Sequence, residues 1–455
     1  MPQGGDPFGV GGLACRFPAD FLWGAATSAF QIEGAAAVDG RGPSIWDTFC
    51  RQPGAVLGGG TGEIACDHYH QLERDLDLMQ ALGLPAYRFS IAWPRVQPTG
   101  SGDWNEAGFA FYERLVDGLL ARGIQPHATL YHWDLPQALQ DAGGWAVRST
   151  VACFVRYAEE VGKRLGGRLA SLATHNEPWV VATLGHEQGI FAPGLRDRAI
   201  AFQVAHHLLL SHGLALRSLR NAGLRCPLGI VLNQSPTHAT TPAAEARARL
   251  EDGLLVRWYM DPLFRGEYPA DVLGYLGTDA PVVIDGDMEA IRQPLDFLGL
   301  NYYTRNLATP EGIRSPAPGT PGLTAMGWEV YPAGLGELLV RLDRDYDLPP
   351  LYVMENGAAF DDRLERDQVL DLARIDYLRA HLAAVADARD AGVDVRGYFV
   401  WSLLDNFEWA SGYARRFGIV YVDYATLRRL PKQSARWYAA LLAAHRHQQH
   451  GESTR

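Results

Sequence analysis

A repeating order of amphipathic segment, glycine and short apolar run constrains the fold of this chain more than any other feature. Between Asp67 and Gly83, apolar residues recur at helical spacing, and the glycine stands where a helix would end. An apolar run that is typical of a strand follows at 86–91. The next unit repeats this order from Tyr112 to the run at 127–131. Each such unit predicts one helix that leads into one strand.

Eight candidate strands arise in this way, and most are separated by a helical segment. They begin near Phe21, Ala86, Pro126, Leu172, Leu228, Phe297, Leu351 and Val395. Strands joined by crossover helices are parallel, and eight such units predict an α/β fold, a single closed (β/α)₈ TIM barrel. An open doubly wound sheet is the alternative. Such a sheet normally carries a glycine-rich nucleotide or phosphate loop, and neither GxGxxG nor GxxxxGK[ST] occurs here.

The predicted barrel accounts for most of the 455 residues, because α/β barrels form unusually large single domains. We expect a flexible N-terminal tail over residues 1–14, the catalytic barrel over 15–445 and a C-terminal tail over 446–455. Two connections that follow strands are long, namely Gln31 to Asp67 and Arg305 to Pro332. Since barrel sites are built from the loops after the strands, these connections predict a deep, loop-walled pocket.

Composition and charge exclude several classes of function. With 47% hydrophobic and 20% charged residues, the chain has the composition of a soluble globular protein. Its formal net charge of −11 argues against a nucleic-acid partner, and no apolar run approaches membrane-spanning length. Five scattered cysteines indicate neither a disulfide framework nor a zinc site. Free thiols and the absence of a signal-peptide pattern predict a cytoplasmic location, while oligomeric state is not indicated.

Two glutamates directly follow strand-like runs and could act as a pair. Glu177 stands in Thr174-His175-Asn176-Glu177-Pro178, and the proline is expected to hold its backbone extended. Glu355 follows the run at 351–354 and precedes Asn356-Gly357, a turn signal. Cleavage of a glycosidic bond needs two such carboxylic groups on either side of the bond. Three further carboxylates also follow strand-like runs: Asp134, Asp405 and Asp423. Periodicity alone does not choose among the five.

Longer motifs do choose among them. In chain order they are Phe21–Gly34 (FLWGAATSAFQIEG), Tyr131–Pro136 (YHWDLP), the two glutamate motifs, Asn301–Thr304 (NYYT), Met326–Trp328 (MGW) and Trp401–Trp409 (WSLLDNFEW). With these motifs the chain resembles glycoside hydrolase family 1, the β-glucosidase family of clan A, from about Phe17 to the Trp437 region. One motif would be a weak signal, but all of them in order on matching strands are specific.

The resemblance implies a retaining β-glucosidase acting on terminal β-D-glucosyl residues of aryl and alkyl glucosides and cello-oligosaccharides, as in cellulose degradation. Side activity on β-fucosides and β-galactosides is expected. By the same resemblance Glu355 is the nucleophile and Glu177 the general acid/base, with their carboxyl groups roughly 5–5.5 Å apart. Arg88 and Tyr303 are implied to favour the ionised form of the nucleophile. The partner would be a small glycoside, with no cofactor and no metal ion.

The resemblance also assigns residues to the bound sugar, whose hydroxyl groups need partners and whose C–H face suits an aromatic ring. The implied substrate-binding residues are Gln31, His132, Asn176, Asn301, Tyr303, Trp328, Trp401, Glu408 and Trp409. Asn176 is expected to bind the 2-hydroxyl group and Glu408 the 4- and 6-hydroxyl groups. Trp401 would form the floor under the sugar, and Trp328 would line the aglycone site. His132 lacks the neighbouring ligands that a metal site needs.

Three alternatives on the same scaffold differ at one or two positions. A 6-phospho-β-glycosidase would replace Glu408 and add a lysine nearby, whereas residues 410–424 contain no lysine and Glu408 would repel a phosphate. A non-catalytic sugar-binding barrel would lack one of the two catalytic glutamates. A plant-type thioglucosidase would carry glutamine in place of Glu177. The natural β-glycoside and its aglycone are not indicated by the sequence.

Overall fold

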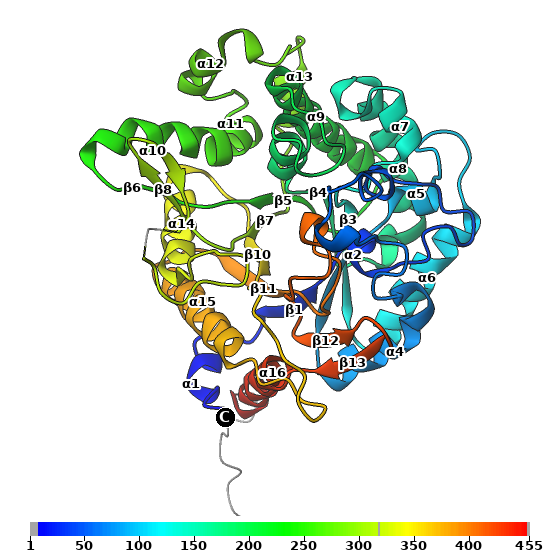
Figure 1. Ribbon diagram of the computed structural model, residues 1–455, viewed down its shortest axis with the longest axis vertical. Helices are drawn as coiled ribbons and strands as arrows, with labels where there is room; N and C mark the ends of the chain where they lie inside the picture. Colours follow the sequence, from blue (N-terminus) through cyan, green and yellow to red (C-terminus); the bar gives the residue numbers. More distant parts are fainter. Residues whose placement is uncertain (1–7, 317–318, 453–455) are drawn as a thin grey trace, which may run out of the picture.

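In the computed structural model, which describes residues 8–316 and 319–452, eight parallel strands close into a barrel surrounded by helices (Figure 1). The barrel strands are β1 (Leu22–Ala26), β2 (Ala86–Ser90), β3 (Gln125–Tyr131), β4 (Ser171–Asn176), β5 (Leu228–Asn233), β7 (Phe297–Asn301), β10 (Leu351–Asn356) and β11 (Val395–Trp401). They follow one another around the barrel in chain order, and β11 pairs with β1. The predicted barrel is confirmed, the doubly wound alternative is wrong, and each predicted strand begins within one residue of the observed start.

Helices cover the outside of the barrel. The longer ones are α4 (His68–Ala81), α6 (Glu106–Ala121), α8 (Ser149–Leu165), α9 (Arg198–Asn221), α14 (Pro332–Asp345), α15 (Leu372–Asp390) and α16 (Gln433–Glu452). The shorter ones are α1 (Gly11–Ala14), α2 (Ala29–Ile32), α3 (Ile45–Phe49), α5 (Trp93–Val96), α7 (Gln137–Asp141), α10 (Glu245–Asp252), α11 (Trp258–Phe264), α12 (Ala270–Leu276) and α13 (Asp287–Ile291). Two π-helical segments, η4 (Val180–Glu187) and η6 (Gly253–Arg257), lie beside α9 and α10.

Helix α4 shows how the sequence pattern produces one unit of the barrel. Its apolar residues Leu72, Leu76 and Met79 are buried, as the helical spacing predicts. Gly83, two residues after the end of the helix, has a φ of +69°, a left-handed conformation that glycine adopts without strain. The chain then turns directly into β2.

The interior of the barrel is filled by small and large side chains from different strands. A Cβ atom on Gly24 of β1 would lie 2.3 Å from the ring of Phe399 on β11, so the glycine leaves room for that ring. Ala86, Ala173 and Val231 belong to the same buried cluster. This close packing makes the barrel a solid core, and a cavity can form only beyond the strand ends.

The long connections after the strands carry their own structure. The connection after β1 contains α2 and α3, and the connection after β7 contains β8 (Asn306–Thr309) and β9 (Gly312–Arg314), which form a small sheet with β6 (Thr237–Ala239). After β11, strands β12 (Val420–Asp423) and β13 (Arg428–Pro431) form an antiparallel pair.

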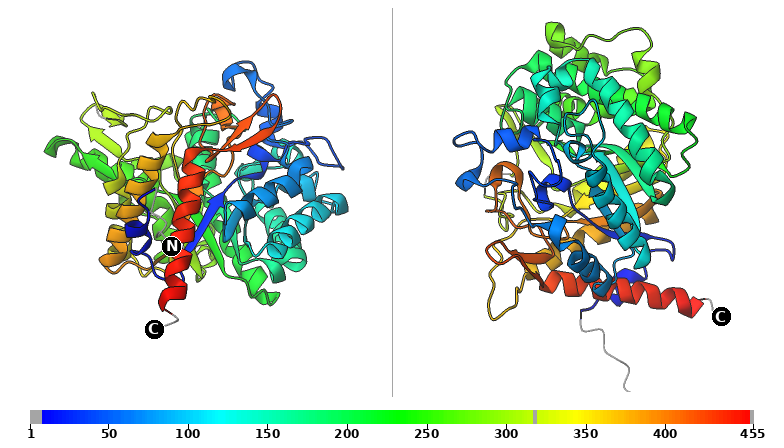
Figure 2. Two further views of the ribbon diagram at one scale, coloured as in Figure 1. Left: turned by 90° about the horizontal axis from the view of Figure 1, so that it is seen from below. Right: turned by 90° about the vertical axis from the view of Figure 1, so that its right-hand side faces the viewer.

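The ends of the described chain lie together. Helix α1 contacts α16, and Figure 2 shows α16 (red) on the outside of the barrel close to β1 (blue). The predicted tails fall partly on residues 1–7 and 453–455, which lie outside the described residues. Within the described part, both predicted tail ranges include helical residues, in α1 and in the last turns of α16. The division into tails and barrel remains a prediction.

Helix α9 corrects one expectation drawn from the sequence. It is long and apolar enough to cross a membrane by length and composition, although no such run was expected. However, 78% of its apolar window is buried inside the protein, where it contacts α8 and α13. We therefore interpret α9 as a core helix.

Candidate active site

A cavity of about 610 Å³ lies at the carboxyl ends of the barrel strands, and we call it the substrate cavity. Nine of the twelve predicted site residues line it: His132, Glu177, Asn301, Tyr303, Trp328, Glu355, Trp401, Glu408 and Trp409. The other three, Gln31, Arg88 and Asn176, are buried and hydrogen-bond to residues of its wall. The structure thus brings together a set of side chains that are spread over nearly 380 positions of the sequence.

Both carboxylate oxygens of Glu355 are held by donors. The Arg88 guanidinium donates to Oε1 at 2.5 Å, and the Tyr303 hydroxyl donates to Oε2 at 2.6 Å. Glu355 is only 2% exposed, and this burial raises its pKa, while the charge of Arg88 and the Tyr303 hydrogen bond oppose the rise. The arrangement fixes the orientation of Glu355 and favours its ionised form.

Glu177 has a different environment. Its one hydrogen-bond donor among the described side chains is the neutral amide of Asn301, at 2.6 Å from Oε1. Burial, and after it the charge of Glu355, raises the pKa of Glu177 to about 8. At neutral pH Glu177 therefore carries a proton that it can donate, while Glu355 has a guanidinium partner. A carboxyl group with a raised pKa beside one that is held by a cation is the pattern of an acid paired with a nucleophile.

One continuous chain of hydrogen bonds connects the two glutamates. Beyond Glu355, Arg88 Nη2 donates to Asn176 Oδ1 at 2.6 Å. The Asn301 amide donates both to this same Asn176 oxygen at 3.0 Å and to Glu177. Its members come from β2, β4, β7 and β10 or, for Glu177, from the residue that follows β4. The positions of the two carboxyl groups are thus coupled through three side chains.

The backbone at Glu177 is left-handed, with a φ of +49°, so the extended conformation expected before Pro178 is wrong. Its amide still donates to Val231 on β5 at 2.8 Å, whereas its carbonyl already accepts from Val180 at the start of η4. The chain must turn from strand to helix at this single residue. A non-glycine residue in this region costs on the order of 1–3 kcal/mol, and such strain gathers at functional sites. Trp133 and Trp409 of the same cavity also have positive φ.

Glu408 is the third carboxylate of the substrate cavity. Burial and the charge of Glu355 raise its pKa to about 8, while a hydrogen bond from Gln31 at 3.4 Å opposes the rise. The Gln31 amide is fixed by two further acceptors, Asn406 and the carbonyl of Phe407. This pair presents polar atoms that can bind adjacent hydroxyl groups.

Aromatic rings form the walls around these carboxylates. The rings of His132 and Trp401 stack with centroids 5.9 Å apart, and His132 also stacks on Trp409 at 6.0 Å. Burial and the charge of Arg88 lower the pKa of His132, so the imidazole is neutral. A neutral imidazole can both donate a hydrogen bond to a sugar hydroxyl group and accept one from it. No group of three or more His, Cys, Asp or Glu side chains within residues 8–316 and 319–452 is placed to hold a metal ion.

Several residues of the cavity wall were not predicted from the sequence. They include Trp133, Trp179, Gln188, Phe191, Asn233, Glu251 and Phe417. Trp133 had a usable signal, because it lies in the same YHWDLP motif as His132 and donates to the Asn176 carbonyl at 2.9 Å. Gln188, Phe191 and Glu251 lie outside the matched motifs, so nothing in the sequence pattern marked them.

The chain is similar to known proteins over almost its whole length. The chain matches the family model of Glycosyl hydrolase family 1 over residues 13–447. It is 49% identical to a β-glucosidase of Agrobacterium sp., over 96% of this chain and 98% of that protein. It is 52% identical to thermostable β-glucosidase B of Thermobispora bispora, over 93% of this chain and 89% of that protein.

Solved structures are similar throughout. Virulence factor SghA in complex with its substrate analog salicin superposes with a TM-score of 0.93 at 46% identity, covering 98% of this chain and 99% of the other. The Thermotoga maritima β-glucosidase in complex with deoxynojirimycin has a TM-score of 0.91 at 44% identity, covering 94% and 99%.

Proposed function

The chain belongs to glycosyl hydrolase family 1 and is a retaining β-glucosidase, and from this premise we propose that Glu355 is its nucleophile and Glu177 its general acid/base. The enzyme hydrolyses terminal β-D-glucosyl residues of aryl and alkyl glucosides and of cello-oligosaccharides. The observation that carries the assignment of roles is the contrast in partners: Glu355 has a guanidinium, and Glu177 has a neutral amide and a raised pKa.

The proposed reaction has two steps. In the first, an oxygen of Glu355 forms a bond to the anomeric carbon while the glycosidic bond breaks, and the proton of Glu177 passes to the leaving oxygen. In the second, Glu177, now ionised, takes a proton from a water molecule whose oxygen displaces Glu355 from the sugar. This requires the two carboxyl groups to lie close enough for direct attack, roughly 5–5.5 Å apart.

We propose that the remaining predicted residues hold the sugar. Asn176 would bind the 2-hydroxyl group, where a hydrogen bond strengthens in the transition state. Glu408 and Gln31 would bind the 4- and 6-hydroxyl groups, with Trp401 beneath the ring. Side activity on β-fucosides and β-galactosides is supported by a relative from Bifidobacterium breve, 45% identical, which is a bifunctional β-D-glucosidase/β-D-fucosidase.

We also propose that the enzyme works in the cytoplasm on small glycosides, without a nucleic-acid or membrane partner. The net charge of −11 and the burial of α9 support this proposal. The five cysteines, all within the described residues, form no disulfide, which suits a reducing compartment. The barrel of residues 15–445 would be the catalytic unit.

Azide rescue tests the two roles. Removing the nucleophile in Glu355→Gly should lower turnover by about a thousandfold or more. Azide should then restore cleavage of an aryl β-glucoside and yield the α-glucosyl azide, because it attacks from the face that Glu355 occupied. In Glu177→Ala, azide should instead attack the glycosyl-enzyme and yield the β-glucosyl azide. NMR of the products distinguishes the two anomers. The same anomer from both variants, or full turnover without azide, would contradict the assignment.

A further inference from the structure

Tyr303 and Trp328 lie side by side in the wall of the substrate cavity. Their ring centroids are 5.6 Å apart, and the Phe417 ring lies 6.1 Å from the first and 6.2 Å from the second. The Tyr303 hydroxyl donates to Glu355 at 2.6 Å, so the position of this ring decides whether the proposed nucleophile keeps one of its donors. A movement of Trp328 would leave space into which the Tyr303 ring could turn.

The loop that carries Trp328 has no regular secondary structure of its own. Its residues 319–331 form neither helix nor strand. The Trp328 amide donates to Thr324 Oγ1 at 3.1 Å, and the Trp328 carbonyl accepts from the Thr324 amide at 2.9 Å. These bonds shape a turn within the loop but do not attach Trp328 to the barrel.

Arg305 and Glu329 attach this loop to the chain that follows β7. Arg305 Nε donates to Glu329 Oε2, and Arg305 Nη2 donates to Glu329 Oε1, both at 2.9 Å. The Thr304 hydroxyl also donates to the Glu329 carbonyl at 2.9 Å. Arg305 comes two residues after Tyr303, and Glu329 directly follows Trp328. Because a bidentate pair fixes both distance and orientation, it holds the two rings at one separation.

Arg305 is itself held in place by other elements. Its guanidinium lies 3.7 Å from the centroid of the Tyr331 ring, and its Nη1 donates to Nδ1 of His238 in β6 at 3.2 Å. His238 Nε2 in turn lies 2.9 Å from Oε2 of Glu337 in α14. The hydrogen bonds with Glu329 raise the pKa of Arg305, so the guanidinium stays charged. The pair therefore has a fixed anchor outside the cavity.

We propose that Arg305 and Glu329 are positioning residues of the hydrolysis. Their pair holds Trp328 against Tyr303, and Tyr303 is thereby kept in place to donate to Glu355. Neither Arg305 nor Glu329 is among the described residues that line the substrate cavity, so the effect passes through the two rings. This inference rests on the proposed function, because it requires Glu355 to be the nucleophile.

Loss of the pair should be visible in the pH dependence of the reaction. Burial raises the pKa of Glu355, and the Tyr303 hydrogen bond is one of the contacts that oppose the rise. When that donor is displaced, the pKa of Glu355 rises further. Since Glu355 must be ionised to attack, the acidic limb of kcat/KM then moves to higher pH. The other charged or titratable groups around Glu355 stay unchanged, namely Arg88 of β2, Glu177 after β4 and Glu408 after β11.

A double-mutant cycle with Tyr303 tests the positioning role. We would measure kcat/KM for p-nitrophenyl β-glucoside against pH in the wild type, Arg305→Met, Tyr303→Phe and the variant that carries both changes. Arg305→Met alone should move the acidic limb up by about half to one pH unit, which is a three- to tenfold loss of kcat/KM below it. In the Tyr303→Phe background the same change should move the limb by less than about 0.2 unit, because the hydroxyl is already absent.

Two further variants separate positioning from a general loss of structure. Arg341→Met removes a bidentate partner of Asp252, in a pair whose side chains are 27% and 13% exposed, against 20% and 12% for Arg305 and Glu329. This control should keep the pH profile of the wild type. Glu329→Gln keeps the size of its side chain and should move the acidic limb in the same direction as Arg305→Met.

The positioning role would be overturned by equal shifts from Arg305→Met with and without the Tyr303 hydroxyl. An unshifted acidic limb in Arg305→Met, as in the control, would overturn it too. If thermal unfolding shows that Arg305→Met does not fold, Glu329→Gln takes its place in the same cycle. A wild type that does not hydrolyse p-nitrophenyl β-glucoside would instead contradict the proposed function.

Discussion

Three carboxylates share the substrate cavity, of which Glu177 and Glu355 are buried and Glu408 is half-buried, and their hydrogen-bond partners differ. Glu355 accepts from a guanidinium and a phenol, Glu177 from an amide, and Glu408 from the amide of Gln31. Since burial raises the pKa of all three, the partner decides which group gives up its proton first. Carboxyl groups of the same type can therefore take different roles in the reaction, because their neighbours differ.

The pH dependence of the enzyme should follow from this difference. Because Glu177 must carry a proton, we expect kcat/KM to fall as pH rises through about 8, the pKa of Glu177. Replacing Glu355 with Gln removes a neighbouring negative charge, so the pKa of Glu177 should decrease. Titration of Glu177 by ¹³C NMR in the Glu355→Gln variant measures this change. Glu408→Gln is the control and should lower it less, because its charge contributes less to Glu177. An unchanged or higher pKa in Glu355→Gln would refute the coupling.

Individual residues were predictable only where a motif covered them. Nothing in residue spacing separated Glu177 and Glu355 from three other carboxylates, and the family resemblance supplied the choice. The left-handed backbone of Glu177 could not be predicted from Pro178, because it arises from a hydrogen bond to β5 and the immediate start of η4. Tertiary contacts override a local preference at that position.

At the scale of elements, a buried ionic cluster fixes the segment that follows β11. Lys432, at the start of α16, is completely buried and donates to Asp405 Oδ1 at 2.7 Å and to Asp362. Asp405 also accepts from the amide of Gly418 at 3.0 Å and from Arg416 at 2.7 Å. The segment between these points carries Glu408, Trp409 and Phe417 of the substrate cavity. The cluster therefore positions part of the sugar site from outside it.

Removing the central cation should weaken both stability and catalysis. In Lys432→Met, Asp405 would keep Arg416 and Asp362 would keep Arg374, but the buried cluster would carry one uncompensated negative charge. We expect a loss of about 3–5 kcal/mol in the free energy of unfolding. Chemical denaturation measures the loss, and kcat/KM on an aryl glucoside should fall with it. Arg396→Met removes a cation from an exposed pair with Asp394 and should cost about 1 kcal/mol or less. Similar losses in the two variants would show that the cluster has no special role.

The barrel strands were predictable because most contain a short, mainly apolar run, a pattern that burial on both faces imposes. The short strands β6, β8, β9 and β13 were not predicted, and β12 was indicated only by the strand-like run before Asp423. All five have three or four residues, lie in the connections and pair with one another, so no periodic pattern predicts them. The long connections were recognised by their length alone. Which of their residues line the cavity depends on how each connection folds over the barrel, and the sequence pattern does not indicate this.

At the scale of the whole molecule, the last helix completes the barrel. Helix α16 packs beside β1, where the Tyr438 hydroxyl donates to the Gly24 carbonyl at 2.9 Å. Its residues Trp437, Leu441 and Leu442 are also buried. The helix thus covers the strand at which the first and last units of the barrel meet.

A chain that ends at Lys432 should therefore fail to fold. Each large apolar side chain of α16 contributes about 1.5–3 kcal/mol when buried, and together they approach the total stability of a typical domain, about 5–15 kcal/mol. The truncated protein should show no cooperative thermal transition by circular dichroism. Tyr438→Phe, which loses one hydrogen bond and keeps the ring, should fold with a cost of about 1 kcal/mol. A cooperative transition in the truncated chain would contradict the closing role of α16.

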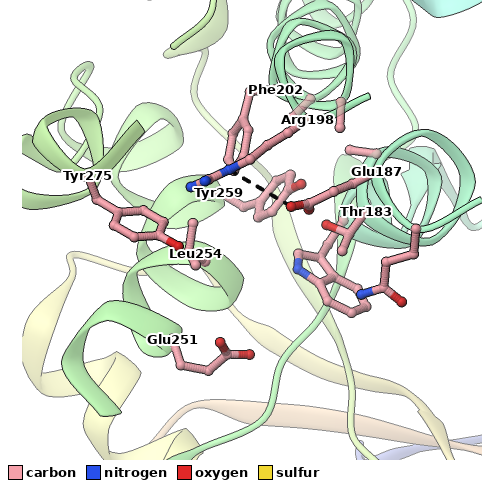
Figure 3. A pocket seen from close by; sticks show the side chains of 13 residues that line it. Thr183, Glu187, Arg198, Phe202, Glu251, Leu254, Tyr259 and Tyr275 are labelled. Carbon is pink, nitrogen blue, oxygen red and sulfur yellow. Dashed lines mark ion pairs between the residues drawn. The ribbon is translucent and has the colours of Figure 1, made fainter. Parts of the chain in front are cut away.

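The overall architecture was predictable almost completely, since eight repeats of one pattern have few other solutions. A second cavity, of about 220 Å³, was not, because it forms where η4, α9 and the segment from α10 to α12 meet (Figure 3). Its walls come from residues that share no motif, and only the three-dimensional contacts bring Glu187 and Tyr275 to one space.

The hydrogen-bond chain between Glu355 and Glu177 has a consequence for how activity is acquired. Its links come from strands that span most of the polypeptide, from β2 to β10, so no half-barrel contains a complete set. A nascent or partly refolded chain could have its helices and strands and still be unable to hydrolyse the substrate. Hydrolysis would begin only when the strands from β2 to β10 are correctly paired. The first appearance of product during refolding would therefore show when these strands have reached their final positions.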